Sequence, residues 1–244
     1  MPSPTLSPND TQTLSLLLNQ PPCTQSTLID PALPSPNPQL QAQELSILHP
    51  LNTANPSPPT LTNAITELTS LITSNPTYAS AYNNRAQALR LLHGDDLTTK
   101  DLAASTVWND LCTAITYASP SPSAEQQLDS DKSDQADVIK VSPFAATVLG
   151  AAYTQRGRLL VKLSQRKEEE GDSWNGGYEE MLPEVLRGKK AGVVEEMASR
   201  NFDMGGRYGC EVGREMAVRT NVYQKACGGI VGEAMRGERM GRGG

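Results

Sequence analysis

The stretch P-T-Y-A-S-A-Y-N-N-R-A-Q-A-L-R-L-L-H-G, from Pro76 to Gly94, decides how the rest of the chain is interpreted. Proline fixes φ and cannot continue a preceding helix, and glycine is favoured just after a helix ends. Between them, apolar side chains recur at spacings of three and four, which predicts one amphipathic helix. The small Ala86 lies where a second helix can approach closely. The positions on this face are Ala81, Tyr82, Arg85, Ala86, Leu89 and Leu92.

The residues just before Pro76 follow a pattern of small and bulky positions. Ala64, Leu68 and Leu71 precede Pro76 by 12, 8 and 5 residues. A small residue, a bulky residue, another apolar residue and then a proline at the turn is typical of the second helix of a tetratricopeptide repeat. The stretch that begins at Pro76 then predicts the first helix of the next repeat.

A second copy of the first-helix pattern occurs further along the chain. Residues 82–89, Y-N-N-R-A-Q-A-L, are echoed 71 residues later by residues 153–160, Y-T-Q-R-G-R-L-L. An uninterrupted tetratricopeptide array repeats about every 34 residues. The longer interval predicts that this chain carries insertions between its repeats.

These segments resemble the tetratricopeptide repeat protein 36 family. Residues 79–91, A-S-A-Y-N-N-R-A-Q-A-L-R-L, are similar to the central repeat of that family, and residues 153–163, Y-T-Q-R-G-R-L-L-V-K-L, are similar to its third. Shorter patterns at 200–202 and 221–227 are similar to its C-terminal part. The resemblance implies an adaptor that protects or positions a metabolic enzyme and is associated with tyrosine breakdown.

The sequence therefore predicts an all-α fold, a right-handed superhelical stack of about three tetratricopeptide helix pairs with long insertions and a C-terminal capping helix. Residues 1–38 are expected to form an N-terminal segment with a short helix and a Pro/Ser-rich linker. Residues 39–240 are expected to form the repeat domain. Its expected parts are repeats at about 39–78, 79–118 and 143–210, disordered insertions at about 119–141 and 164–190, and the capping helix at about 213–235.

The charge distribution argues against nucleic acid as a partner. The formal net charge is −6, and residues 1–84 contain no Lys or Arg. The basic residues that follow are interspersed with acids, so no segment forms the basic footprint that nucleic acid requires. Because the N-terminus lacks both a charged region and a long apolar run, we expect neither a signal peptide nor a membrane span.

The chain shows no pattern of residues that is typical of an enzyme or a metal site. Its 4 cysteines are widely spaced without a C-x-x-C pair, and it has 2 histidines. This spacing favours free thiols in a reducing compartment over zinc ligands or a disulfide framework. No phosphate-binding loop, dinucleotide-binding turn or hydrolase motif occurs in a suitable context. We expect a cytoplasmic or nuclear protein that is not an enzyme and has no metal or cofactor.

The concave face of the predicted stack is the candidate site for a protein or peptide partner, because repeat proteins bind ligands there. Tyr82 and Arg85 are expected to face neighbouring helices instead, with the Arg85 head paired to a carboxylate. A structural role is also open for Asn84. The predicted partner-binding positions are Asn83, Asn84, Gln87, Arg90, Gln155 and Arg158.

Besides an enzyme with an unrecognised site, which a cleft with converging titratable groups would support, two other functions are left open by the sequence. One is a self-associating structural module, although a monomer is favoured. The other is a co-chaperone that grips the C-terminal carboxylate of a chaperone, since Asn84 lies where such a clamp places its Asn. The third repeat offers Ala151 and Gln155 where that clamp needs Lys and Arg, so the charge-assisted bonds would be missing.

Seven serines are followed directly by proline and lie in predicted linkers. Such steps are candidates for proline-directed phosphorylation, but they also punctuate loops without any modification. These residues are Ser3, Ser7, Ser35, Ser57, Ser119, Ser121 and Ser142.

Overall fold

The computed structural model describes residues 27–99, 102–120, 139–171, 174 and 176–221. The chain divides into two compact units. The larger unit comprises Ile29–Pro120 and Val141–Gly244. The smaller comprises Met1–Leu28 and Ser121–Lys140, of which only residues 27–28 and 139–140 are described.

Helices dominate the described residues, which confirms the expectation of an all-α fold. The exception is one short pairing of strand β1 (Thr27–Ile29) with strand β2 (Ile139–Val141). The helices are α2 (Pro38–Leu48), α3 (Pro58–Ser74), α4 (Ala79–His93), α5 (Leu102–Ala118), α7 (Pro143–Glu170), α8 (Gly176–Met181), α9 (Ala191–Arg207) and α10 (Glu211–Arg219), with 3-10 turns η1 (His49–Leu51) and η3 (Glu184–Leu186).

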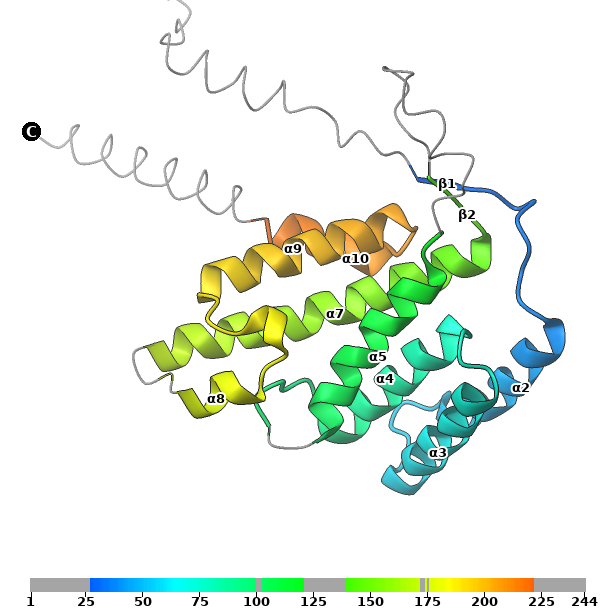
Figure 1. Cartoon of the computed structure of the whole chain (residues 1–244), viewed down its shortest axis with the longest axis horizontal. Helices are drawn as coiled ribbons and strands as arrows, with labels where there is room; N and C mark the ends of the chain where they lie inside the picture. The colour runs from blue at the N-terminus through cyan, green and yellow to red at the C-terminus, as the bar shows by residue number, and fades with distance from the viewer. Residues whose placement is uncertain (1–26, 100–101, 121–138, 172–173, 175, 222–244) are drawn as a thin grey trace, which may run out of the picture. The chain divides into compact units, whose positions relative to one another are not determined.

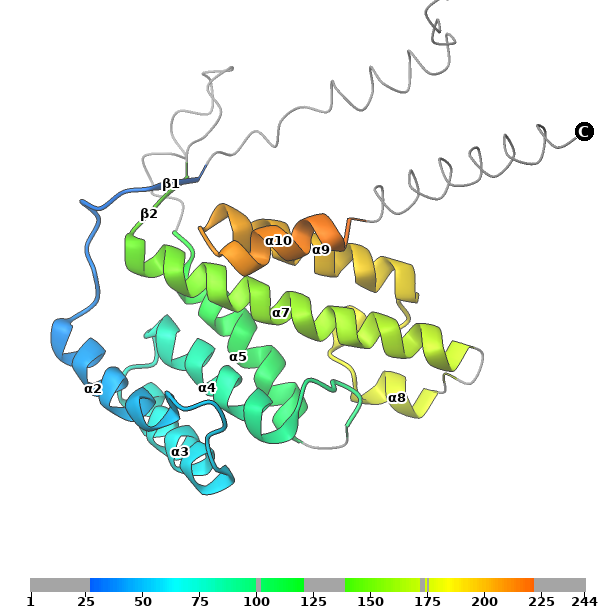
Figure 2. The same ribbon diagram turned by 180° about the vertical axis from the view of Figure 1, so that it is seen from behind.

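The long helices of the larger unit pack against one another in chain order (Figures 1 and 2). α2 packs on α3, α3 on α4, α4 on α5, α5 on α7, α7 on α9 and α9 on α10. α4 and α7, which carry the two copies of the sequence pattern, also contact each other. We call α2, α4 and α7 the first helices and α3, α5 and α9 the second helices, following the order in which they alternate along the chain.

The helix predicted between Pro76 and Gly94 is α4. Gly94 follows its last residue at φ 89°, a backbone conformation that glycine adopts at little cost. The predicted apolar face is turned inward, since Ala81 and Ala86 are fully buried and Leu89 is 8% exposed. The position of Ala86 allows the close helix approach expected from its size.

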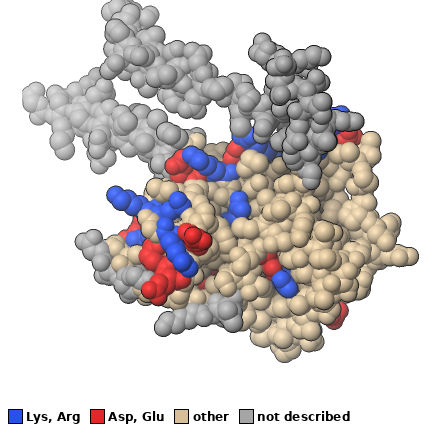
Figure 3. All heavy atoms as spheres, in the orientation of Figure 1, with Lys and Arg blue, Asp and Glu red and all other residues tan. Residues whose placement is uncertain are grey.

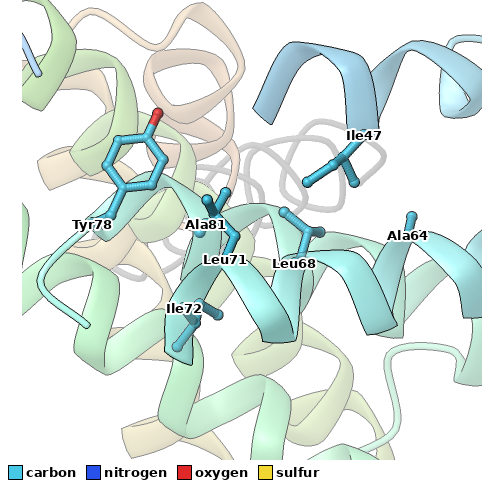
Figure 4. Close-up of a cluster of buried hydrophobic side chains, with 7 residues drawn as sticks. All are labelled: Ile47, Ala64, Leu68, Leu71, Ile72, Tyr78 and Ala81. Atoms are coloured by element: carbon cyan, nitrogen blue, oxygen red, sulfur yellow. The ribbon is translucent and has the colours of Figure 1, made fainter. Parts of the chain in front are cut away.

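An apolar cluster joins α2, α3 and the start of α4 (Figure 4). Ile47 from α2 lies beside Leu68 of α3, whose side chain is fully buried. The pattern of small and bulky residues before Pro76 (Ala64, Leu68 and Leu71) therefore lies on the side of α3 that faces its neighbours. The buried members of the cluster are Ile47, Ala64, Leu68, Leu71, Ile72, Tyr78 and Ala81.

α7 and α9 approach closely at a glycine. A Cβ atom added to Gly157 would lie 2.8 Å from the ring of Phe202, which is fully buried. Real Cβ atoms do not come that near another heavy atom, so the aromatic ring occupies the space that a side chain would need. Gly157 holds the position that Ala86 holds in the first copy of the pattern.

The expectation of a disordered insertion over 164–190 was wrong for its described residues. α7 continues to Glu170, and α8 lies beside its end (Figure 1). The Lys167 ammonium lies 2.5 Å from a Glu179 carboxylate oxygen and 4.5 Å from the centre of the Trp174 ring. The segment was misjudged because its many charges pair within it. Its buried apolar residues include Leu182 and Leu186.

Two of the Ser-Pro steps begin helices. The Ser57 hydroxyl accepts a hydrogen bond from the amide of Thr60 at 3.4 Å, and Pro58 is the first residue of α3. Ser142 caps α7 in the same way. A serine cap followed by proline at the first helical position is a favoured start.

Charge is unevenly distributed over the surface of the larger unit. In the view of Figure 3, charged side chains gather over α8 and α9, and the surface over α3 is mostly uncharged. The difference follows the sequence, in which residues 1–84 contain no Lys or Arg.

α10 packs on α9 and contacts α7. It begins two residues before the expected capping helix, and residues 222–235 of that expectation lie outside the described residues. So do the expected N-terminal helix and most of the expected insertion at 119–141. Among the described residues, no helix combines the length and the apolarity needed to cross a membrane.

Replacing Leu68 by Ala should lower the free energy of unfolding by about 2–5 kcal/mol, because the deletion leaves a cavity in the cluster of Figure 4. Urea denaturation followed by circular dichroism measures the change. The matched control is Leu45→Ala, which removes the same atoms from a side chain that is 66% exposed. It should change stability by no more than about 0.5 kcal/mol. Equal losses in the two variants would contradict the assigned core.

Gly157→Ala should cost about 1–3 kcal/mol, since the added methyl group must displace the Phe202 ring. Thermal unfolding of the variant and the parent chain provides the measurement. Gly192→Ala is the control, because a Cβ atom at Gly192 meets no atom within 4 Å. Alanine is the better helix former, so this control should leave stability unchanged or slightly raised.

Candidate functional site: a groove along the first helices

Figure 2 shows the side of the array formed by α2, α4 and α7. Two hollows adjoin there. One, of about 530 Å³, lies between α4, α7 and the start of α10, and we call it the α7 hollow. The other, of about 580 Å³, lies between α2, η1 and α4, and we call it the α2 hollow. Gln87 and Leu91 line both, so the two form one inner groove that crosses α4.

Five of the six predicted binding positions line the inner groove. Four line the α7 hollow, and Asn84 together with the shared Gln87 lines the α2 hollow. Asn83 does not line it: the residue is 5% exposed and its side-chain oxygen accepts a hydrogen bond from Gln155 at 2.8 Å. The positions in the α7 hollow are Gln87, Arg90, Gln155 and Arg158.

A buried carboxylate connects α2 to α4 beneath the groove. Glu44 of α2 is 6% exposed, and its oxygens accept hydrogen bonds from the Tyr78 hydroxyl at 2.6 Å and the Asn84 amide at 2.8 Å. A buried carboxylate is costly unless its oxygens are bonded. Because both Glu44 oxygens have a donor, the network fixes α2 against α4 and orients Asn84.

Tyr78 is the donor that this carboxylate depends on. Burial, together with the hydrogen bond to Glu44, raises the pKa of Tyr78, so its hydroxyl stays protonated. The ring also stacks on Phe144 in the first turn of α7, with centroids 5.9 Å apart. Tyr78 therefore contacts both helices that flank α4 along the groove.

Glu44 was missed in the sequence analysis. The signal that could have indicated it is the position of an acidic residue within an apolar helical pattern, in a segment without any Lys or Arg to pair with it. Such a carboxylate either faces solvent or finds neutral donors. The sequence did not show which, because Tyr78 lies 34 positions away.

A second series of side-chain hydrogen bonds joins α4 to α7. The Arg90 guanidinium donates to Gln155 at 2.9 Å and to Asp95 at 2.7 Å, and Gln155 donates in turn to Asn83. The Arg90 side chain is only 10% exposed. Arg90 is thus part of the floor of the α7 hollow, and its charge is offset by Asp95.

Three polar side chains of the α7 hollow are exposed and available to a ligand. Gln87 of α4 and Arg158 and Lys162 of α7 line the α7 hollow. Within the part of the chain that the structure describes, none of them makes a hydrogen bond or an ion pair. Arg158 and Lys162 are separated by one helical turn, so both cations lie on the same side of α7.

The arginine that both sequence copies have at their fourth position, Arg85 or Arg156, points away from the groove. Arg85 makes a two-point contact with Asp110 of α5, at 2.7 and 2.8 Å, as expected for a head paired to a carboxylate. Arg156 donates to Asn201 of α9 at 2.6 Å. Both arginines therefore fix a first helix to the second helix of its own pair.

The positions that a chaperone-tail clamp would use are occupied differently here. Ala151 and Gln155 line the α7 hollow where Lys and Arg would be needed. Asn84 is engaged with Glu44. The cations of the hollow occur further along α7, at Arg158 and Lys162.

Comparison with known proteins finds a relative along almost the whole chain. The L-tyrosine degradation gene cluster protein hmgX of Aspergillus fumigatus is 38% identical over 260 residues, which cover 96% of this chain and 94% of that protein. This chain belongs to the hmgX family. No family model matches it, and no solved structure does. The name of that relative carries the link to tyrosine degradation that the sequence resemblance implied.

In this hmgX-family chain, Tyr78→Phe should lower the free energy of unfolding by about 1–3 kcal/mol, because Glu44 stays buried and loses a donor. Urea denaturation measures the loss. Tyr82→Phe is the matched control, since the Tyr82 hydroxyl donates to the Pro76 carbonyl at an exposed site. It should cost less than about 1 kcal/mol. A loss at Tyr82 as large as that at Tyr78 would contradict the role given to Glu44.

Proposed function

We propose that this protein is a non-catalytic adaptor that binds a segment of a partner protein in the inner groove and serves tyrosine degradation. The groove itself carries the proposal. Three first helices, α2, α4 and α7, line its two hollows, which share Gln87 and Leu91. Polypeptide segments bind in such concave surfaces of helical arrays.

We infer that the array is a stack of three tetratricopeptide helix pairs with α10 as a cap. The inference is supported by equivalent contacts in the two copies of the sequence pattern. Tyr82 lies against Tyr117 of α5 with ring centroids 5.9 Å apart, and Tyr153 lies against Tyr208, which follows α9, at 6.0 Å. In both α4–α5 and α7–α9, a tyrosine of the first helix thus packs on a tyrosine at the C-terminal end of the second, with ring planes 47° apart in one pair and 6° apart in the other. Membership of the tetratricopeptide repeat protein 36 family belongs to the same proposal.

Large apolar side chains in the groove favour a protein partner. Leu91, at the junction of the two hollows, is 56% exposed, and Leu45 of the α2 hollow is 66% exposed. Adjacent exposed leucines rimmed by polar residues mark sites of protein interaction. Their presence in one groove supports binding of a partner segment over binding of a small polar metabolite.

The link to tyrosine degradation is taken from the relative named above. We place the adaptor in the cytoplasm or the nucleus. The described cysteines, Cys112 and Cys210, are free thiols, as is usual in a reducing compartment. Neither nucleic acid nor a membrane is part of the proposal.

Leu91→Asp should reduce recovery of the partner about tenfold or more, because it puts a charge where the partner's apolar side chains bind. The tagged full-length chain is purified from the native cell grown on L-tyrosine, and bound proteins are quantified by mass spectrometry. The matched control is Val185→Asp, since Val185 is 53% exposed and lies outside the groove. It should leave recovery unchanged.

Circular dichroism of both variants checks that the helices are intact. Equal recovery with the parent chain and Leu91→Asp would overturn the groove as the binding site. Light scattering of the purified chain tests self-association: a dimer that Leu91→Asp dissociates would assign the groove to a second copy of the chain instead.

A further inference from the structure

The geometry points to a two-part partner segment, with acidic residues over the α7 hollow and leucine-like residues over the α2 hollow. This inference rests on the proposed function and specifies the chemistry of the partner. It follows from the different character of the two hollows, which meet at Gln87 and Leu91.

The α7 hollow is a local excess of positive charge. Its lining contains three cations, Arg90, Arg158 and Lys162, and one carboxylate, Asp95. Because Asp95 already pairs with Arg90, the charge that faces a ligand comes from Arg158 and Lys162. The chain as a whole has a formal net charge of −6, so this sign is not a general property of its surface. Acidic side chains complement such a site.

The α2 hollow differs from it in being nearly without charge. Among its described lining residues, His49 is the one ionisable side chain. Four leucines and Ala88 supply the apolar surface, and Asn52, Asn84 and Gln87 supply amide groups. A segment with leucine-like side chains fits this lining, whereas a charged side chain would lose its hydration here without gaining a partner.

The surface beyond Lys162 limits how far the acidic part can extend. The next hollow along α7 is lined by four carboxylates, Asp95, Asp96, Glu169 and Glu170, and two cations, Lys162 and Arg166, so its net charge is negative. Acidic residues of a partner would meet like charge there. The acidic residues of the partner are therefore confined to the stretch above Arg158 and Lys162. The part of the partner segment with leucine-like side chains then crosses α4 at Leu91.

A nucleic acid fits the groove less well than this protein segment does. A nucleic-acid chain carries a charge at every nucleotide and needs cations along its whole path. Among the described residues, the α2 hollow has no Lys or Arg that could bind a phosphate group. The apolar half of the groove thus selects a polypeptide whose acidic residues are restricted to one end.

Fluorescence anisotropy tests the inference with the full-length chain and two labelled synthetic peptides. One peptide has a leucine-rich half joined to a glutamate-rich half, and the other has glutamine in place of each glutamate. The glutamate peptide should bind about tenfold more tightly, and the difference should shrink as salt is added. In a chain that carries both Arg158→Gln and Lys162→Gln, the two peptides should bind equally.

The matched control carries Arg200→Gln and Arg219→Gln, which change the net charge equally at side chains that are 76% and 67% exposed and line neither hollow. It should keep the preference for glutamate. Equal binding of the two peptides to the parent chain, a preference that survives Arg158→Gln and Lys162→Gln, or binding of neither peptide overturns the two-part segment. None of these results affects the proposed function, which depends on partner recovery by Leu91→Asp.

Discussion

The helices of the larger unit bury their apolar sides against the helices that precede and follow them, and the rest of the described structure depends on that packing. The contacts require small residues where helix axes approach. Ala86 is the small residue between α4 and its neighbours. Gly157 is the small residue between α7 and α9, where even one methyl group would collide with Phe202. Because packing commits the outer sides of α4 and α7 to their second helices, the opposite sides are left to line a groove.

Individual helices were predictable from the sequence because the spacing of apolar residues and the proline and glycine residues at helix ends are local signals. The helix between Pro76 and Gly94 and five of six groove positions could be placed in this way. Interactions between distant positions could not. Glu44 finds Tyr78 across 34 residues, and Lys167 finds Glu179 in a segment whose charges suggested disorder. Composition records the charges of such a segment but not their pairing.

The groove is built on polar contacts that are complete without a ligand. Glu44, Asn84, Gln155 and Arg90 satisfy one another or their neighbours, so the first helices are held in place before anything binds. A preformed surface avoids the entropic cost of ordering on association. The side chains left over, chiefly the exposed leucines and the two cations of α7, are those that can distinguish one partner from another.

The Ser-Pro steps also differ in their accessibility to a kinase. The Ser142 hydroxyl caps α7 and the residue is 9% exposed, while the Ser119 hydroxyl donates to a carbonyl in the last turn of α5. The Ser142 hydroxyl would have to leave this cap and become exposed before a kinase could reach it. Ser35, which is exposed in the connection before α2, bears no such cost. The fold therefore restricts access to Ser142 and leaves Ser35 and Ser57 exposed.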